Sequence, residues 1–366
     1  MNERVLITAD AVGGVWQYST DLAAALVPLG YRPILALLGP APTAEQRAHA
    51  ARLEGVELIE TGFTLDWLAS DEATVRATAR GVAALARETG AGLLQLNQPA
   101  LAGEPMPVPA IAVAHSCVAT WWRAVRGIEP MPSSFSWQAR LMRAGLIAAD
   151  LVACPTAAFA GALADCYALP KAPRVVHNGR APIVTSAGAL HDFAFTAGRL
   201  WDEGKNLATL DQAAARLSVP LKAAGPLVAP HGGSAVFAHL HASGPVSVSW
   251  IARCLSARPV FVSAARYEPF GLAVLEAAMA GCPLVLADIP TFRELWGDVA
   301  TLVPPDDAAG FALAIEELIG DTSRRLAQGD LARRHARRFS PAAMAEAMAA
   351  LYRELGCAPR TERVAA

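Results

Sequence analysis

The sequence is poor in charge and has no long apolar run. Asp, Glu, Lys and Arg make up 17% of its 366 residues, and no stretch reaches the about 18 apolar residues that a transmembrane helix needs. The N-terminus has no basic start followed by an apolar stretch and a cleavage site. We therefore expect a cytoplasmic protein without a transmembrane segment, while peripheral contact with a membrane stays open.

Cysteine spacing, net charge and the scarcity of lysine narrow the function classes further. The six cysteines form no C-x-x-C pair, which argues against a zinc site or a disulfide framework. The formal net charge of -2 argues against a nucleic-acid-binding protein, because phosphate neutralisation needs a basic domain. Of 31 basic residues only Lys171, Lys205 and Lys222 are lysine, so each of these is a candidate for a specific role.

The length and the order of apolar runs predict two α/β domains. A chain of 366 residues is longer than one core usually supports. Short, uniformly apolar runs alternate with helical stretches, as in parallel sheets that are buried on both faces. In the first half we expect strands at 4–8, 33–38, 55–60, 92–97, 110–116 and 151–156, and helices at 15–29, 72–89 and 135–149.

A second set of strands follows residue 179, at 193–200, 221–226, 244–249, 259–264, 283–288 and 300–305. The polar stretch 168–190 is the best linker, so we predict an N-terminal domain at 1–168 and a second domain at 169–340. Residues 341–366 form a C-terminal segment that begins with an amphipathic helix at 341–356. Twin Rossmann-like domains bind ligands at the carboxyl ends of their strands, which directs attention to the cleft between them.

Two loops of the first domain could face a ligand. Gly13 and Gly14 lie between the first strand and the first helix, where backbone amides can approach an anion closely. The pair is not a full G-x-G-x-x-G, and ordinary turn chemistry explains it equally well. His115 ends an apolar strand; it is either a hydrogen-bonded strand-end histidine or a functional group at the ligand-binding edge of the sheet.

The stretch "AGRLWDEGKNL" (197–207) places Arg199 and Lys205 six positions apart around a glycine-containing turn. Surface cations in a loop are usually solvated. Across a tight turn, however, the two can converge on one pyrophosphate, with arginine as a planar fork and lysine as a point charge.

The stretch "YEPFGLAVLEAAMAGCP" (267–283) places two glutamates at the start of a helix. Pro269 marks the helix start, so the following backbone amides are free to bind an anion. Glu268 and Glu276 could simply stabilise the helix dipole. A carboxylate is also a natural acceptor for a vicinal diol, so the arrangement suits a nucleotide-sugar, which has hydroxyls at both ends and phosphates between them.

These motifs resemble glycosyltransferase family 4, which comprises retaining transferases of the GT-B fold. Glu268 and Glu276 match its E-x7-E motif, "GRLWDEGKNL" resembles its basic loop, and "HNG" (177–179) and "GGVWQYSTDLAAAL" (13–26) also match. The resemblance extends from near residue 5 to about 355. It implies two Rossmann-like, doubly wound domains facing across a cleft, with the terminal helix packing back towards the N-terminal domain.

The resemblance also implies roles for these residues. Arg199 and Lys205 would bind the donor diphosphate, Glu276 the ribose hydroxyls and Glu268 the donor sugar. The remaining donor contacts would come from the diphosphate-binding loop and from the amides at the helix start, namely Gly13, Gly14, Phe270, Gly271 and Leu272. His115 would lie near the sugar and the site of attack.

The expected activity is transfer of a hexose, with retention, from a nucleoside-diphosphate-sugar to a hydroxyl acceptor. No D-x-D occurs in the sequence, so we expect no metal and no other cofactor. A catalytically silent nucleotide-sugar-binding protein and a Rossmann-type NAD-dependent oxidoreductase are the alternatives. A metal site at His231, His239 and His241 is a further alternative, although histidines in a glycine-rich loop are usually solvated.

The acceptor is a saccharide, a lipid-linked molecule or a small molecule, and the sequence does not choose among them. Aromatic rings that stack on a sugar and arginines that bind an anion would suit it. The N-terminal domain offers Trp16, Tyr18, Trp121, Trp122, Arg123 and Arg126. For the aromatic residues packing is the stronger interpretation, and the Trp121–Trp122 pair can simply be that.

Overall fold

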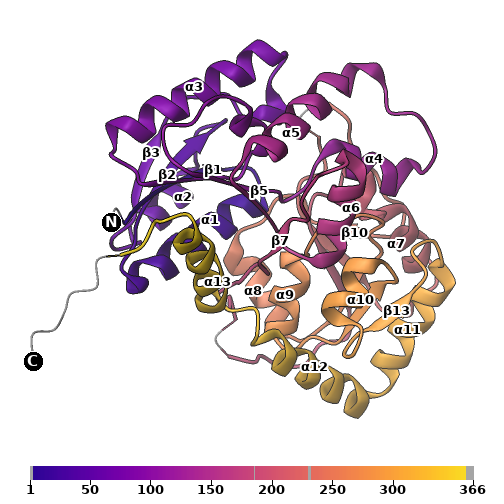
Figure 1. Cartoon of the computed structure of the whole chain (residues 1–366). Coiled ribbons are helices and arrows are strands. Elements are labelled where there is room, and N and C mark those ends of the chain that lie inside the picture. The colour runs from indigo at the N-terminus through magenta and orange to yellow at the C-terminus, as the bar shows by residue number, and fades with distance from the viewer. Residues whose placement is uncertain (1–2, 185, 230–231, 360–366) are drawn as a thin grey trace, which may run out of the picture. The chain divides into compact units, whose positions relative to one another are not determined.

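The computed structural model describes residues 3–184, 186–229 and 232–359. The chain forms two compact units, each built around its own sheet (Figure 1). The N-terminal unit contains the described residues up to Trp122, then Ile128–Arg180, and those from Ser340 onward. The second unit contains Ala181–Phe339 together with the short segment Arg123–Gly127.

The N-terminal unit has a seven-stranded parallel sheet in the order β3-β2-β1-β4-β5-β6-β7. Neighbouring side chains on β1 alternate between two cores, with Val5 and Ile7 on one face and Leu6 on the other. The strands are β1 (Arg4–Asp10), β2 (Arg32–Leu38), β3 (Glu57–Glu60), β4 (Leu93–Leu96), β5 (Ala110–Val113), β6 (Leu151–Cys154) and β7 (Arg174–Val175).

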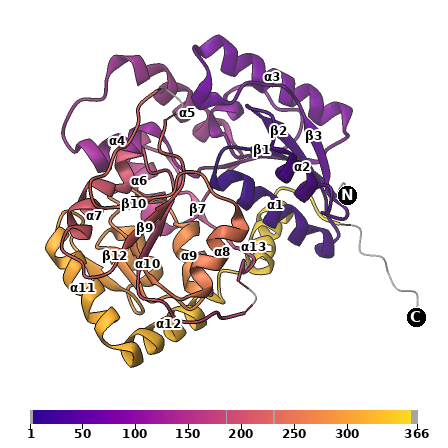
Figure 2. The same cartoon turned by 180° about the vertical axis from the view of Figure 1, so that it is seen from behind.

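Helices cover both faces of this sheet. The C-terminal helix α13 (Pro341–Glu354) lies beside α1 (Gly14–Leu26), and Met348 and Tyr352 are buried with Leu22 against one face (Figure 2). On the other face, α3 (Glu72–Glu88), η3 (Pro99–Gly103) and α5 (Ser136–Ala148) form the second core. The remaining helices are η1 (Val27–Leu29), α2 (Ala44–Ala50), η2 (Asp66–Leu68), α4 (Val118–Arg126), η4 (Ser133–Phe135) and α6 (Ala157–Tyr167). Residues Arg123–Arg126 at the end of α4 are counted with the second unit.

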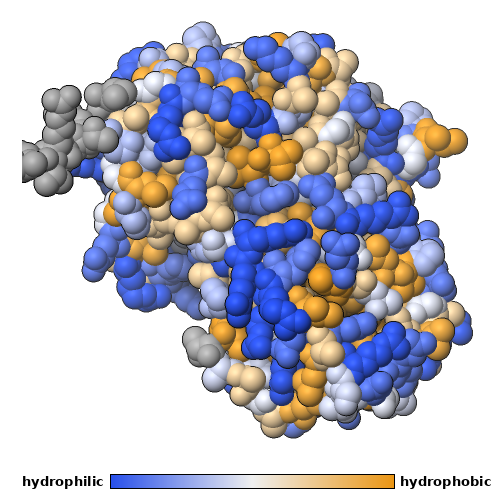
Figure 3. All heavy atoms as spheres, turned by 60° about the horizontal axis from the view of Figure 1, so that its bottom comes forward, coloured by the Kyte–Doolittle hydropathy of each residue, from blue (hydrophilic) through white to orange (hydrophobic). Residues whose placement is uncertain are grey.

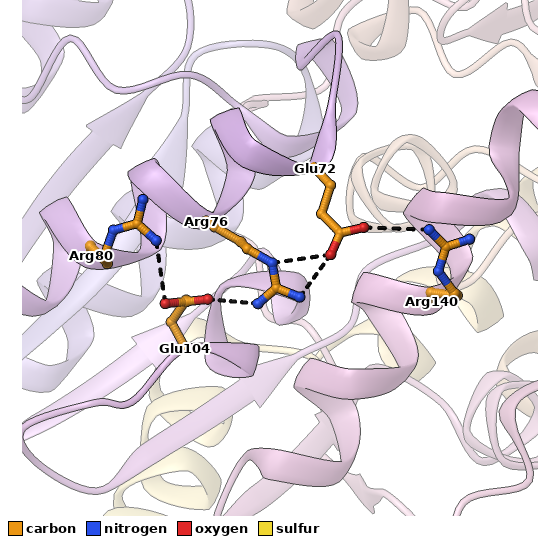
Figure 4. Close-up of polar contacts among 5 residues, drawn as sticks. All are labelled: Glu72, Arg76, Arg80, Glu104 and Arg140. Atoms are coloured by element: carbon orange, nitrogen blue, oxygen red, sulfur yellow. Dashed lines mark hydrogen bonds and ion pairs between the residues drawn. The ribbon is translucent and has the colours of Figure 1, made fainter.

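An ion-pair network fastens α3 to its neighbours (Figure 4). Arg76 lies at its centre and pairs with Glu72 at 2.7 Å and with Glu104, just after η3, at 2.6 Å. Arg140 of α5 approaches Glu72, and Arg80 approaches Glu104. The arginines beside them lower the pKa values of both glutamates. Because all of these side chains are partly exposed, each pair contributes only modestly to stability. The network mainly fixes the positions of α3, α5 and the end of η3 relative to one another.

The second unit has a six-stranded parallel sheet in the order β10-β9-β8-β11-β12-β13. Its strands are β8 (Ala194–Ala197), β9 (Leu221–Ala224), β10 (His241–Ala242), β11 (Val260–Ser263), β12 (Leu284–Ala287) and β13 (Thr301–Val303). Its helices are η5 (Glu203–Lys205), α7 (Leu207–Ala214), α8 (Val248–Ser256), α9 (Leu272–Met279), α10 (Pro290–Trp296), α11 (Ala308–Gly320) and α12 (Thr322–Ala336). Every residue of β12 is buried, so this sheet too is covered on both faces.

The first unit ends later than the predicted boundary at 168. The strand β7 still pairs with β6, and the ring of His177 bonds to the carbonyl of Pro155 at 2.8 Å, so the chain stays in the first unit up to Arg180. A Cβ added to Gly179 would lie 2.2 Å from the carbonyl oxygen of Ser340. The outgoing and the returning chain therefore touch here, and this contact requires glycine.

One predicted strand, 244–249, is wrong. The alternating "PVSVS" is typical of a strand, but Ser247 accepts a hydrogen bond from the Trp250 backbone and caps α8, which begins at Val248. The short strand in this region is β10, just before the predicted one. A serine cap therefore overrides the β propensity of the valines.

Within the described residues, no helix is long and apolar enough to cross a membrane. On the face drawn in Figure 3, hydrophobic side chains are scattered among hydrophilic ones. Single exposed hydrophobic residues such as Val236 are ordinary on protein surfaces.

Candidate functional site

The loop after β8 carries Arg199 on a turn that Asp202 organises. One carboxylate oxygen of Asp202 accepts from the backbone amide of Gly204 at 2.9 Å, and the other accepts from the guanidinium of Arg199 at 2.9 Å. The guanidinium of Arg199 also lies 5.8 Å from the centre of the Trp201 ring. Arg199 is exposed, with 44% of its side chain accessible, while Asp202 is buried. The turn therefore presents a cation on a rigid support.

Lys205 and Glu268 form an ion pair at the carboxyl ends of the strands of the second sheet. The backbone joins their loops as well, because the carbonyl of Gly204 accepts from the amides of Arg266 and Tyr267 at 2.9 and 3.2 Å. Lys205 and Glu268 are only 20% and 15% exposed. The lysine and the glutamate that the sequence predicted to face one ligand are thus in direct contact.

Asn206 holds the loops after β8 and β11 together, a role that the sequence pattern does not predict. It has φ of 55°, a left-handed conformation that is uncommon outside glycine and for which asparagine is enriched. Its side-chain amide donates to the carbonyls of Ala264 and Pro305 at 3.1 and 2.8 Å, and its oxygen accepts from the Thr209 hydroxyl at 3.1 Å. The signal was an asparagine between a turn and a helix start, where its side chain can satisfy backbone groups.

The helix α9 begins at the predicted position with an open N-terminus. Gly271 precedes it with φ of 94°, and no side chain caps it. Phe270 is buried and packs edge-to-face on Phe339, so only its backbone is available to a ligand. Glu276 lies further along the same helix and is half-buried. The amides at Gly271 and Leu272 and the positive end of the helix dipole favour an anion at this place.

A small, open pocket lies at the carboxyl ends of the strands of the second unit. Lys205 and Glu268 supply its charges, and the hydroxyl residues Thr196 and Ser263 also line it. The other lining residues are Ala197, Gly198, Leu200, Leu207, Phe261, Ala273 and Val274. Of the predicted site residues the pocket thus joins Lys205 and Glu268, while Arg199 and Glu276 are not among its lining residues.

The other predicted donor residues belong to the N-terminal unit. Gly13 has φ of 96° and precedes α1, and Gly14 is the first residue of that helix; both are exposed, and a Cβ at Gly13 would meet nothing within 4 Å. His115 follows β5 and is half-buried. Its Nε2 lies 3.1 Å from Oδ1 of Asn97, and its ring packs edge-to-face on Tyr18 at 4.5 Å. Burial lowers the pKa of His115 to about 4, so the imidazole is neutral at neutral pH.

The predicted acceptor residues divide into buried and accessible ones. Trp16 and Tyr18 are each only 2% exposed and pack in the N-terminal unit, which corrects the expectation that their rings stack on an acceptor. Trp121 and Trp122 on α4 are partly exposed, with ring centres 6.1 Å apart. Trp122 also donates from its indole nitrogen to the Glu129 carbonyl at 2.8 Å.

The two predicted acceptor arginines, Arg123 and Arg126, cluster with the second unit. Arg126 pairs with Glu203 there at 2.6 Å, and Arg123 is exposed. These two cations and the two tryptophans remain the candidates for an acceptor contact.

The residues that the structure describes contain no group of three or more His, Cys, Asp or Glu side chains arranged for a metal ion. Of the histidines considered for such a site, His231 lies outside the described residues. His239 and His241 are exposed.

Two family models match consecutive parts that together make up most of the chain. A model described as Glycosyltransferase Family 4 matches residues 12–182, and one described as Glycosyl transferases group 1 matches residues 191–321. The chain belongs to glycosyltransferase family 4. The first match contains Gly13, Gly14 and His115, and the second contains the pocket and α9.

Curated relatives match only over short segments. A D-inositol 3-phosphate glycosyltransferase from Corynebacterium aurimucosum is 37% identical over 87 residues, which are 23% of this chain and 21% of that protein. A glycogen synthase from Mycobacterium tuberculosis is 44% identical over 57 residues, 15% of this chain and 14% of that protein. The matched part thus spans about one fifth or less of these relatives.

Solved structures match over the full length. A sucrose-phosphate synthase from Thermosynechococcus elongatus has a TM-score of 0.76 at 18% identity, covering 97% of this chain and 99% of that chain. Anabaena HepE in complex with UDP and glucose has a TM-score of 0.72 at 18% identity, covering 96% and 100%. Together with the two parallel sheets, these matches show that the fold is GT-B.

Proposed function

We propose that this protein is a retaining glycosyltransferase that moves a hexose from a nucleoside-diphosphate-sugar to a hydroxyl acceptor. One observation carries the proposal: a lysine–glutamate pair lines a pocket beside the uncapped N-terminus of α9. The family membership supports it, as does the likeness to HepE, which was solved with UDP and glucose.

The anion-binding groups would hold the diphosphate. Lys205 and Arg199 supply positive charge, and the amides at Gly271 and Leu272 add the helix dipole. Glu276 on the same helix would accept hydrogen bonds from the ribose hydroxyls. Glu268 would accept from the donor sugar, and because it contacts Lys205, the groups proposed to bind the sugar and the phosphates lie next to each other.

The reaction would proceed on one face of the sugar. The bond from the anomeric carbon to the phosphate oxygen breaks, the acceptor oxygen forms the new bond on the same face, and the acceptor proton passes to the leaving diphosphate. This route needs no enzyme nucleophile. The protein contributes positioning and stabilisation of the charge that builds on the diphosphate, and Arg199 and Lys205 would do this without a metal ion.

The test is a transfer assay with UDP-, GDP- and ADP-hexoses and a panel of saccharide, lipid-linked and small-molecule acceptors. We expect one donor to give a product whose anomeric configuration, read by proton NMR, equals that of the donor. An inverted product would contradict the retaining mechanism. Donor binding with neither transfer nor hydrolysis would instead indicate a catalytically silent nucleotide-sugar-binding protein.

A further inference from the structure

A buried polar network lies behind His115 in the N-terminal unit. Asn97, the residue after β4, is 5% exposed and is the residue that His115 contacts through Nε2. The amide nitrogen of Asn97 donates to the backbone carbonyl of Thr8 at 2.6 Å and to the hydroxyl of Ser19 at 3.0 Å. Its backbone amide also donates to the Thr8 hydroxyl at 2.9 Å. Asn97 is therefore held from three directions.

The Thr8 carbonyl shows which side-chain atom of Asn97 is the nitrogen and which is the oxygen, and this assigns the donor and the acceptor in the bond to His115. A carbonyl oxygen can only accept, so the Asn97 atom that faces it must be the amide NH2. The other side-chain atom, Oδ1, is then an acceptor that faces His115. The imidazole must donate from Nε2, and in the neutral ring this leaves Nδ1 with the lone pair. Nδ1 has no hydrogen bond to any residue that the structure describes.

The network continues to the C-terminal helix. Oδ1 of Asn97 also accepts from the amide nitrogen of Gln95 at 3.2 Å, which orients that side chain as well. The Gln95 oxygen then accepts from the hydroxyl of Tyr352, a fully buried residue on α13. The amide nitrogen of Gln95 also donates to the hydroxyl of Tyr18 at 3.3 Å.

We propose that Asn97 is a positioning residue that keeps His115 in the Nε2–H tautomer, and that Gln95 and Tyr352 keep Asn97 in place. His115 then offers Nδ1 as a hydrogen-bond acceptor, so its partner is a hydroxyl group of the substrate and not a phosphate oxygen. The substrate part of this inference rests on the proposed function. The assignment of the His115 tautomer does not rest on it, because that assignment follows from hydrogen bonds within the N-terminal unit alone.

The tautomer is measured directly on protein labelled with 15N-histidine. Long-range proton–nitrogen NMR spectra distinguish the two neutral tautomers, and the His115→Gln spectrum identifies the signal of His115. We expect the Nε2–H form in the wild type. A signal of the Nδ1–H form would overturn the inference, whether or not the protein transfers a sugar. The expected tautomer without any transfer would instead count against the proposed function alone.

Variants test whether Asn97 acts through His115. In Asn97→Ala, His115 should populate both neutral tautomers. The turnover rate should fall about tenfold, the loss expected for one hydrogen bond, with little change in donor KM. His115→Ala and the double variant should then have equal rates, because nothing remains for Asn97 to position. An additive loss in the double variant would indicate a merely structural residue and overturn the proposal.

A milder pair of variants covers the case in which Asn97→Ala fails to fold. Tyr352→Phe removes the hydroxyl that holds Gln95. Tyr31→Phe is the matched control, because its hydroxyl faces the backbone carbonyls of Cys357 and Ala349, at 3.3 and 3.5 Å, and the Arg353 side chain, but not Gln95. We expect the His115 nitrogen signals to shift in Tyr352→Phe and to stay unchanged in Tyr31→Phe. Equal shifts in both variants, or none in Tyr352→Phe, would contradict the proposed coupling.

Discussion

Lys205 at the end of η5 and Glu268 before α9 form an ion pair, and both line one pocket at the carboxyl edge of the second sheet. Each side chain neutralises the other within this pair. A diphosphate would compete with Glu268 for the lysine, and a sugar hydroxyl would compete with the lysine for Glu268. Under the proposed function the pair would couple the two halves of the donor, and the following predictions separate them.

Glu276→Ala should weaken binding of the nucleotide-sugar and of the free nucleotide alike, because both contain the ribose. Hydrogen bonds to a charged group are worth about 1.5 to 3 kcal/mol, so the loss should be roughly 10-fold to 150-fold. Isothermal titration calorimetry with both ligands measures it. An unchanged affinity for the free nucleotide would remove Glu276 from the ribose site.

Glu268→Gln should separate transfer from nucleotide binding. The sugar loses its carboxylate, so we expect transfer to fall by at least about a hundredfold. Free nucleotide should bind as well as before or more tightly, because Lys205 no longer has a carboxylate that neutralises it. Glu203→Gln is the control for nucleotide binding: Glu203 lies in the loop of Lys205 but pairs with Arg126, so the nucleotide affinity should be unaffected. Equal losses of transfer and nucleotide affinity in Glu268→Gln would contradict this division.

Arg199 and Lys205 should act mainly on the turnover rate. If they neutralise the diphosphate as it departs, they stabilise the transition state more than the bound donor. Loss of one such contact commonly costs about 2.7 to 4 kcal/mol, or a hundredfold to a thousandfold in rate. Arg199→Ala and Lys205→Ala together should fall short of additive, because both act on one group. Steady-state kinetics of the single and double variants decide it, and undiminished turnover in the double variant would refute the assignment.

Wild-type transfer should survive a chelator. The proposal gives the charge-stabilising role to two side chains, so EDTA should leave the rate unchanged. Loss of activity in EDTA that magnesium or manganese restores would transfer this role to a bound cation.

Arg325→Ala should destabilise the second unit. The Arg325 side chain is 1% exposed, donates to the carbonyls of His191 and Arg258 at 2.6 and 2.7 Å, and pairs with Asp192 at 2.8 Å. Its removal takes away these hydrogen bonds and leaves a cavity where a buried side chain lay, and we expect a loss of about 3 kcal/mol in urea unfolding. The neighbouring Arg324 is exposed and pairs at the surface, so Arg324→Ala should change stability by less than about 0.5 kcal/mol. Similar effects of both substitutions would contradict this account of Arg325.

The sequence predicted the elements whose pattern is set by burial. The helix expected at 72–89 is α3 (Glu72–Glu88), and the apolar run at 283–288 contains β12, every residue of which is buried. Prediction failed where a single side chain decides the backbone. Ser247 turns a strand-like run into the start of α8, and Asn206 takes a left-handed conformation that no hydrophobic pattern reveals.

The candidate site was predictable as residue types but not as contacts. The rarity of lysine singled out Lys205 and the spacing of acidic residues singled out Glu268, yet their ion pair joins positions that lie 63 residues apart. Tyr18 resembled an acceptor-binding ring because an aromatic residue near a ligand loop suits either a surface or a core. Only packing distinguishes the two, and it places Tyr18 in the core beside Gln95.

The most direct test of the proposed donor site is a thermal-shift panel of UDP-, GDP- and ADP-sugars on the wild type and on Lys205→Ala. A ligand at 100 times its dissociation constant stabilises the folded protein by about 2.7 kcal/mol. We predict that the sugars of one nucleotide raise the melting temperature of the wild type and that this rise shrinks in Lys205→Ala. No stabilisation by any nucleotide-sugar, or the same rise in both proteins at every donor concentration, would contradict the account.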